Sequence, residues 1–143
     1  MTLTDSLVAP ATVAAYRETE YRVGGQGGLV LRVGQRSRDL LAAHSSAGVD
    51  CSAFVTACNP HSAPLSTAAN LERQAALAEE LRRLGFAYRE GIGQHPDNGW
   101  PGEPSFLVLG ISLEDARALG ERYGQNAIVW SGADAVPQLV MLR

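Results

Sequence analysis

The chain has 143 residues, of which 45% are hydrophobic and 19% are charged, and its formal net charge is -3. This is the composition of a globular chain of single-domain size, neither disordered nor membrane-embedded. The charge excludes the basic stripe that nucleic acid binding requires, and no apolar stretch is long enough for a membrane span, so we expect neither nucleic acid nor membrane partners.

Hydrophobic periodicity and turn residues predict an alternation of helices and strands along the chain. The glycine-rich segment 24–28 is expected to be a loop, two prolines predict another loop over 59–64, and 91–104 is expected to be a long one. The predicted helices cover 9–21, 37–44, 66–84 and 112–123, and the predicted strands cover 29–33, 52–58, 86–90, 105–109, 126–130 and 138–142.

Several residues predict where these elements end. Ser37 and Ser112 are expected to cap helix N-termini, and Gly48 and Gly85 to close helices in a left-handed conformation. The almost continuous apolar run 52–58 is typical of a strand buried on both faces. The longest helix carries one stripe of core positions, which are Leu71, Gln74, Leu77, Ala78, Leu81 and Leu84.

This order of elements predicts an α/β fold, with α+β as the alternative: one domain over 1–143, with helices packed on a mixed β-sheet and 126–142 as a terminal hairpin. Residues 1–15 are the candidate for a loosely packed N-terminal segment. Cys51 and Cys58 are seven positions apart in a strand-like segment, where an odd spacing points side chains to opposite faces, so we expect no disulfide. Unpaired cysteines without a leader-like segment predict a cytoplasmic protein.

Polar residues gather in 59–62, 70–74, 99–105 and 125–126. Asn59 follows the predicted buried strand, and ligands often bind at such strand ends. Asn70 and Arg73 lie on one side of the long helix near its N-terminus, where backbone N–H groups favour an anion. The alternative is that Asn70 bonds locally and Arg73 pairs with Glu80 or a loop acid.

The segment 100–105 places an indole, a carboxylate and a hydroxyl in a loop stiffened by two prolines. Glu103 is a candidate general base, or a binder of an amine or an arginine. The alternative is that Glu103 caps a helix or pairs with a neighbouring arginine, and that Trp100 serves packing.

Metal and nucleotide motifs are absent from the sequence. The three histidines and two cysteines have no zinc spacing, so no metal and no cofactor is expected. The chain contains no lysine, which excludes P-loop chemistry, and it has neither G-x-G-x-x-G nor G-x-S-x-G.

The segments 54–60, 65–66, 70–74, 100–105 and 124–130, together with Gly110, resemble the bacterial family called domain of unknown function 3293. The resemblance runs from about Tyr16 to the C-terminus, and Cys58 stands where a larger apolar residue is expected. It implies a small cytoplasmic bacterial domain, and it names no activity, substrate or catalytic residue.

Three hypotheses for function follow. The first is a binding module for a small anionic or nucleotide-like ligand, or a peptide. The second is an enzyme on a small metabolite or nucleotide, with Glu103 as acid or base, Arg73 as anion clamp, and Asn59 or Gln125 stabilising charge. The third is a structural role, with a Glu103–Arg73 pair and Asn59 as a turn former. The sequence predicts no oligomeric state. The candidate ligand-binding residues are Asn59, Asn70, Arg73, Trp100, Glu103, Ser105 and Gln125.

Overall fold

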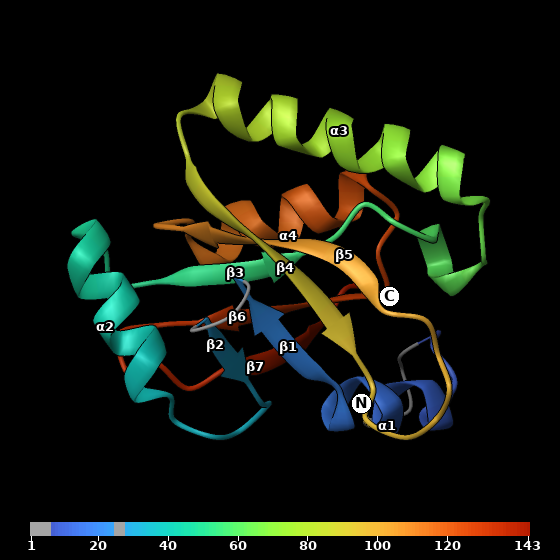
Figure 1. The fold of residues 1–143 in the computed structure, drawn as a ribbon, viewed down its shortest axis with the longest axis horizontal. Coiled ribbons are helices and arrows are strands. Elements are labelled where there is room, and N and C mark those ends of the chain that lie inside the picture. The colour runs from blue at the N-terminus through green and yellow to red at the C-terminus, as the bar shows by residue number, and fades with distance from the viewer. Residues whose placement is uncertain (1–6, 25–27) are drawn as a thin grey trace.

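The structure is a computed structural model, and it describes residues 7–24 and 28–143. These residues form one seven-stranded sheet, four α-helices and a short 3-10 helix, η2 (Figure 1). The helices are α1 (Pro10–Glu18), α2 (Arg38–Ala47), α3 (Thr67–Leu84), α4 (Leu113–Arg122) and η2 (Pro60–Ser62), and the strands are β1 (Glu20–Val23), β2 (Leu29–Leu31), β3 (Ser52–Val55), β4 (Ala87–Gln94), β5 (Glu103–Leu109), β6 (Ala127–Ser131) and β7 (Gln138–Met141).

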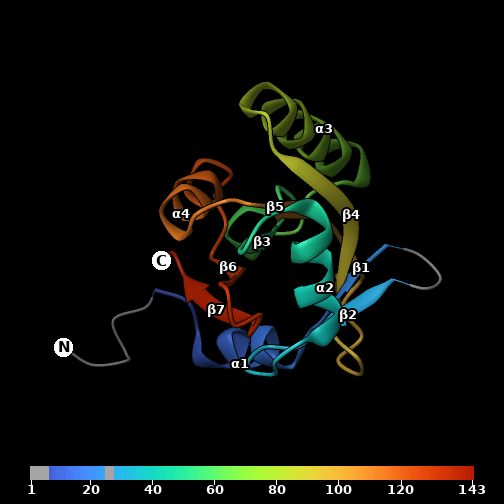
Figure 2. The ribbon, with the colours of Figure 1, turned by 90° about the vertical axis from the view of Figure 1, so that its left-hand side faces the viewer.

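The sheet has the strand order β2-β1-β4-β5-β3-β6-β7, and every neighbouring pair is antiparallel. It curls from β4, β1 and β2 on one side to β6 and β7 on the other, with α2 inside the curl (Figure 2). The prediction of one domain with helices packed on a sheet is confirmed. The sheet is not mixed as predicted, because every pair is antiparallel, and this corresponds to the α+β alternative. The predicted terminal hairpin is also confirmed, as β6 and β7.

Side-chain alternation gives the sheet two apolar faces. Along β5, Leu107 and Leu109 belong to the core that α2 fills with Leu40, whereas Phe106 and Val108 belong to a second core beneath α3 and α4. We call the α2 side the inner face. Each fully buried side chain of this size stabilises the fold by about 1.5–3 kcal/mol, so both cores are needed to hold the curled sheet.

Serine and glycine set the helix ends as predicted. The side chains of Ser37 and Ser112 accept hydrogen bonds from the N–H groups of Leu40 and Asp115, and Gly48 and Gly85 end α2 and α3 with φ of 70° and 81°. The predicted stripe of α3 is only partly correct. Gln74, Leu77 and Leu81 are buried and Ala78 is partly buried, but Leu71 and Leu84 at the two ends of the stripe are exposed.

The predicted helix 9–21 is too long, because α1 ends at Glu18 and β1 begins at Glu20. The Thr19 hydroxyl donates to the carbonyl of Ala15, which closes the helix. From there Tyr21 and Val23 alternate onto the inner face between β2 and β4. Four residues of alternation are too short a signal to outweigh the preceding helix formers, and pairing on both sides stabilises this strand.

Strand β4 continues to Gln94, so the predicted loop 91–104 shrinks to 95–102. Gly91 and Gly93 were interpreted as breakers, but they are strand residues on the inner face. A Cβ at Gly91 would lie 2.5 Å from the carbonyl oxygen of Arg22 and 2.8 Å from the ring of Phe54. Glycine is therefore required here for a close approach, not for a turn.

Two further boundaries differ from prediction, because β2 ends at Leu31 and β3 ends at Val55. Cys51 and Cys58 consequently flank β3, and both are free. All four residues of β3 are buried, which confirms the predicted burial for the first part of 52–58. The predicted loop 24–28 and N-terminal segment 1–15 fall partly outside the described residues. Among the helices of 7–24 and 28–143, none is both long and apolar enough to cross a membrane.

Candidate functional site

A cleft of about 720 Å³ opens at the end of the inner face opposite α2. In Figure 1, α2 lies on the left, and the segments that border the cleft lie on the right and below: α1, the loop 95–102 and the segment 58–65. Tyr21, Phe54 and Val129 belong both to the apolar core and to the cleft wall. The cleft is therefore a continuation of the inner face that no helix fills.

The two-residue period of the strands places polar side chains in the cleft. On β5, Glu103 and Ser105 line the cleft, and Leu107 and Leu109 continue the same face into the core. Polar residues at one end of a strand face and apolar residues at the other thus divide a single surface into a site and a core.

Asn59 organises the side of the cleft next to Glu103. Its backbone N–H donates to Asn70 Oδ1 at 2.9 Å, and its side-chain oxygen accepts from Asn70 Nδ2 at 2.8 Å and from the N–H of Leu65 at 3.0 Å. Its amide nitrogen donates to Glu103 Oε2 at 2.9 Å. Asn59 therefore joins β5, α3 and the 58–65 segment at one point.

The Glu103 carboxylate is partly buried. Burial raises its pKa above the ordinary carboxyl value, and the hydrogen bond from Asn59 acts in the opposite direction. Its second oxygen, Oε1, accepts no hydrogen bond from residues 7–24 or 28–143. A desolvated carboxylate whose second oxygen has no partner among the described residues can accept a hydrogen bond or a proton from a ligand.

The backbone beside this carboxylate is strained. Asn59, His61 and Ser62 have φ of 46°, 55° and 59°, which lie in the left-handed region that residues other than glycine rarely adopt. The segment is held by a hydrogen bond from the N–H of His61 to the carbonyl of Gly124 at 2.7 Å. Such strain persists only where surrounding contacts enforce it, and it clusters at functional sites.

A second polar group lies on the α1 side. The hydroxyls of Tyr16 and Ser62 are 2.5 Å apart, and Asn126 Nδ2 donates to both. All three residues line the cleft. They connect α1 to the segments before α3 and after α4, so the cleft has a polar group on each of two sides.

Two buried glutamines complete the wall. Gln125 Nε2 donates to the carbonyls of Cys58 and Tyr123 at 3.0 and 3.2 Å, which fixes its oxygen in the opposite direction. Gln74 Oε1 accepts from the N–H of Ala57 at 3.0 Å, and its Nε2 has no partner among the described residues. Each glutamine thus leaves one polar atom without a partner in the described part of the chain.

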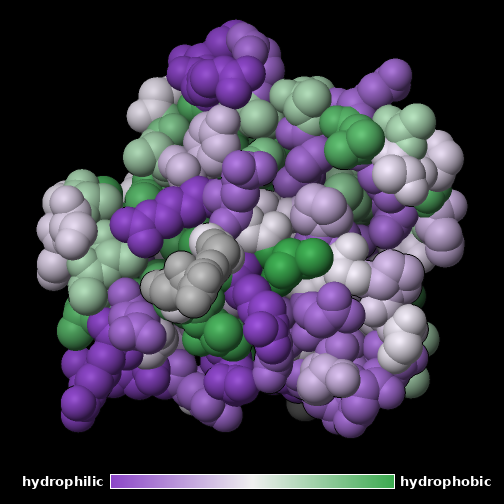
Figure 3. Space-filling view, viewed as in Figure 1, coloured by the Kyte–Doolittle hydropathy of each residue, from purple (hydrophilic) through white to green (hydrophobic). Residues whose placement is uncertain are grey.

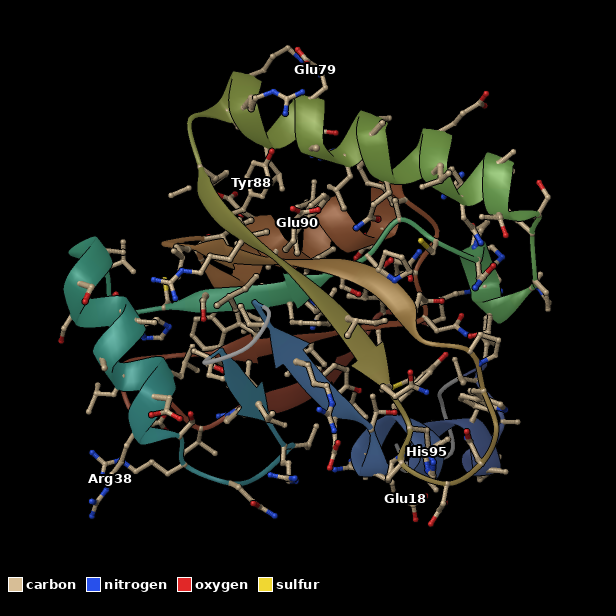
Figure 4. All side chains as sticks on the ribbon, in the orientation of Figure 1. Glu18, Arg38, Glu79, Tyr88, Glu90 and His95 are labelled. Carbon is tan, nitrogen blue, oxygen red and sulfur yellow. The ribbon has the colours of Figure 1, made fainter. Side chains whose placement is uncertain are left out.

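The loop 95–102 is held by His95. Its Nε2 bonds to Glu18 of α1 at 2.9 Å, and Figure 4 shows the two side chains together beside that helix. Its Nδ1 accepts from the N–H groups of Asp97 and Asn98, so Nε2 carries the proton. The ring of Trp100 lies 6.3 Å from that of His95 and is 45% exposed at the cleft border.

Arg73 does not line the cleft. Its guanidinium donates to the carbonyls of Ala57 and Tyr123, both at 2.6 Å. The predicted ion pair with Glu80 is wrong, because Glu80 bonds to Arg122 and Tyr123. The alternative Glu103–Arg73 pair is not formed either. Arg73 links the end of β3 to the end of α4, and two of its guanidinium nitrogens are engaged by these carbonyls.

The structure brings together six of the seven predicted residues, as lining of one cleft, and leaves out Arg73. The local hydrogen bonding considered for Asn70 is also wrong, since its partner Asn59 is eleven positions away. Sequence reasoning missed Tyr16 and Tyr21, which were assigned to a helix, and Thr56. Position 56 follows Phe54 by two on a strand face, and that alternation could have identified it.

Metal and thiol chemistry have little support in the cleft. Within the described part of the chain, no three His, Cys, Asp or Glu side chains lie close enough to hold a metal ion. Cys58 is 1% exposed, and burial raises the pKa of its thiol. A buried, protonated thiol is a weak nucleophile.

The fold and site define a class: a curled antiparallel sheet whose inner face is filled by a helix at one end and open as a polar cleft at the other. The family model described as protein of unknown function (DUF3293) matches residues 55–128, just over half of the chain, and the protein belongs to that family. The matched range contains all seven candidate residues. Six of them line the cleft, and Arg73 lies beside it. No curated protein and no solved structure matches the chain.

Proposed function

We propose that the protein is a binding domain for a small organic ligand, which it holds in the cleft at the open end of the curled sheet. The observation that carries this proposal is the convergence of buried polar side chains from separate segments on one cavity of about 720 Å³. Ligand sites are typically cavities of about 300–1,000 Å³ with an apolar wall and a few directed polar groups.

The mixture of lining residues supports recognition. Tyr21 and Phe54 give an apolar wall, and Glu103 and Gln125 each present an oxygen without a partner among the described residues. Gln74 Nε2 is buried and likewise has no partner there. Because a buried polar atom without a partner costs free energy, a ligand that supplies the partner stabilises the site. An anionic ligand was expected from Arg73, and that expectation loses its basis because Arg73 bonds to two carbonyls.

A thermal-shift screen of the purified protein against amines, nucleosides, amino acids, sugars and short peptides tests this proposal, followed by titration of each hit. A ligand at 100 times its Kd stabilises the fold by about 2.7 kcal/mol, which raises the Tm by several degrees. Trp100→Ala is expected to weaken binding, because the exposed indole borders the cleft.

Leu84→Ala is the matched control, since Leu84 is 54% exposed at the far end of α3 and does not line the cleft. Hits whose affinity falls in Trp100→Ala and not in Leu84→Ala support the proposal. An empty screen, or hits that respond equally to both substitutions, would overturn it.

An acid–base enzyme is the second candidate, and the raised pKa of Glu103 is what favours it. Catalytic carboxyls are often tuned upward by burial in this way. Arg73 is unable to clamp an anion from its position, so the enzyme would act on a ligand without that contact. Turnover of a bound ligand that Glu103→Gln abolishes, with binding retained, would establish this candidate over simple binding.

We also propose that the protein works in the cytoplasm of a bacterium. Cys51 and Cys58 are free thiols, as is usual for proteins of reducing compartments, and the family resemblance implies bacterial origin. Fractionation of cells that express the tagged chain tests the location, and recovery in a secreted or periplasmic fraction would contradict it.

A further inference from the structure

Several of the hydroxyls that line the cleft donate their only proton to the protein. A hydroxyl donates one hydrogen bond, and four of the lining side chains direct theirs to protein carbonyls at 2.6–3.0 Å. Each can therefore offer a ligand only lone pairs. These residues are Thr19, Tyr21, Thr56 and Ser105.

The carboxylate and one buried amide add further acceptors. Glu103 Oε1 has no donor among residues 7–24 and 28–143. Gln125 is 7% exposed, and its oxygen likewise has no partner there, because its nitrogen is committed to the carbonyls of Cys58 and Tyr123. Most of the atoms that these residues leave for a ligand are thus acceptors, and the exception among the buried lining atoms is the donor Gln74 Nε2, which has no partner among the described residues.

The charge of the cleft has one sign. Among the described residues that line it, Glu103 is the only Asp, Glu, Lys or Arg. The nearby Arg73 is bonded to two carbonyls outside the lining, and His95 uses both ring nitrogens within its own loop and α1. No cation of the cleft therefore competes for Glu103 Oε1 or attracts an anion.

Aromatic rings supply the remaining surface. Tyr21 and Phe54 meet edge to face, with centroids 5.2 Å apart, on the inner wall, and Trp100 stands at the border. Aromatic faces attract cations as well as apolar groups. A ring wall with one carboxylate is a combination that suits a positively charged nitrogen on an apolar body.

We infer that the cleft selects ligands that carry a cationic nitrogen group, an ammonium or amidinium, on an apolar or aromatic body, with the nitrogen donating to Glu103 Oε1. This inference rests on the proposed function and names its ligand class. The remaining hydroxyl proton of the Tyr16–Ser62 pair adds one donor on the α1 side, so such a ligand can also carry an acceptor.

Calorimetric titration with three probes of one shape tests the inference: benzamidine as the cation, benzamide as the neutral analogue and benzoate as the anion. Benzamidine is expected to bind about tenfold more tightly than benzamide, as a charge-assisted hydrogen bond provides, and benzoate most weakly. Glu103→Gln keeps the shape and the acceptor for Asn59, and it should bring the benzamidine and benzamide affinities together.

Glu121→Gln, which neutralises an exposed carboxylate of α4 outside the cleft, is the matched control and should leave the tenfold ratio unchanged. Circular dichroism confirms that each variant is folded. The inference is overturned if benzamide or benzoate binds as tightly as benzamidine or more tightly, or if the ratio of benzamidine to benzamide affinity is unchanged in Glu103→Gln. In either case, binding of the probes in the cleft still supports the proposed function. No binding of any probe at about 10 mM, a concentration that small fragments require, also overturns it, and the library screen then decides the proposed function separately.

Discussion

Asn59 organises the site mainly through hydrogen bonds to other protein groups, which leave few of its polar atoms for a ligand. Its backbone and side chain make hydrogen bonds to Asn70, Leu65 and Glu103. Asparagine tolerates the left-handed conformation, with φ of 46° here, better than most residues. The sequence indicated both a turn former and a ligand contact at this position, and the geometry gives Asn59 chiefly the role of positioning Glu103.

Glu103 is expected to lower the stability of the fold at neutral pH, because its charged carboxylate is partly buried in the cleft. Its pKa is raised in the folded state, so its contribution to stability is present below the ordinary carboxyl pKa and is lost as pH rises through the raised value. Glu103→Gln should therefore raise the Tm relative to the parent protein at pH 8, and this gain should shrink at pH 4.

Thermal unfolding of both proteins across that pH range measures the difference, with Glu121→Gln as the control for loss of one carboxylate. A gain in Tm that is equal at both pH values, or larger at pH 4, would contradict the assignment of Glu103 as a desolvated carboxylate.

At the scale of elements, β4 contains glycines that predict a loop when the sequence is considered alone. Gly91 and Gly93 lie on the same face of the strand, but their surroundings differ. A Cβ at Gly91 would meet the Arg22 carbonyl at 2.5 Å and the Phe54 ring at 2.8 Å, whereas a Cβ at Gly93 would have no neighbour closer than 3.8 Å. The pair therefore provides a matched test of how closely the strands are packed.

Gly91→Ala should lower the free energy of unfolding by about 1–3 kcal/mol, because the backbone of β1 has to move. Gly93→Ala should be neutral or stabilising by about 0.5–1 kcal/mol, since alanine costs less conformational entropy than glycine in a strand. Urea denaturation of both variants measures this difference. Equal stabilities would show that β1 and β4 are not packed as described.

Elements with local signals were predictable, and elements that depend on distant partners were not. Ser37, Ser112, Gly48 and Gly85 set helix ends through bonds within a few residues, so the sequence predicts those ends. Strand β1 and the second half of β4 are stabilised by pairing with each other and by contact with Phe54. The pairing joins residues about 70 positions apart, and Phe54 is about 40 positions from Gly91, separations that a local pattern cannot reveal.

Arg73 illustrates the same limit for the site. Its spacing from Asn70 predicted correctly that both lie on one side of α3, but the direction of a long flexible side chain depends on what the fold places nearby. Two carbonyls at the ends of β3 and α4 lie within its reach, and Arg73 donates to both, sharing the carbonyl of Tyr123 with Gln125. Buried carbonyls without partners are costly, so this use of the guanidinium takes precedence over an anion.

At the scale of the molecule, the two ends of the inner face of the sheet differ in what covers them. Leu40 and Ala43 of α2 fill the inner face at one end, and the polar cleft occupies the other. On the face seen in Figure 3, hydrophilic residues are spread widely and hydrophobic ones occur in small groups between them. The polar clusters in the sequence identified the residues of the cleft, but only the curl of the sheet brings their separate segments together.

The most direct test of the account is a map of amide chemical shifts in the 15N-labelled protein during titration with benzylammonium. The account predicts shifts confined to the cleft segments, residues 12–21, 54–74, 93–105 and 125–129, with the amide of Glu103 among the most affected. Shifts spread over the outer surfaces of α3 and α4, or no shifts at concentrations where small cations bind such sites, would contradict the claim that the open end of the sheet is a ligand cleft.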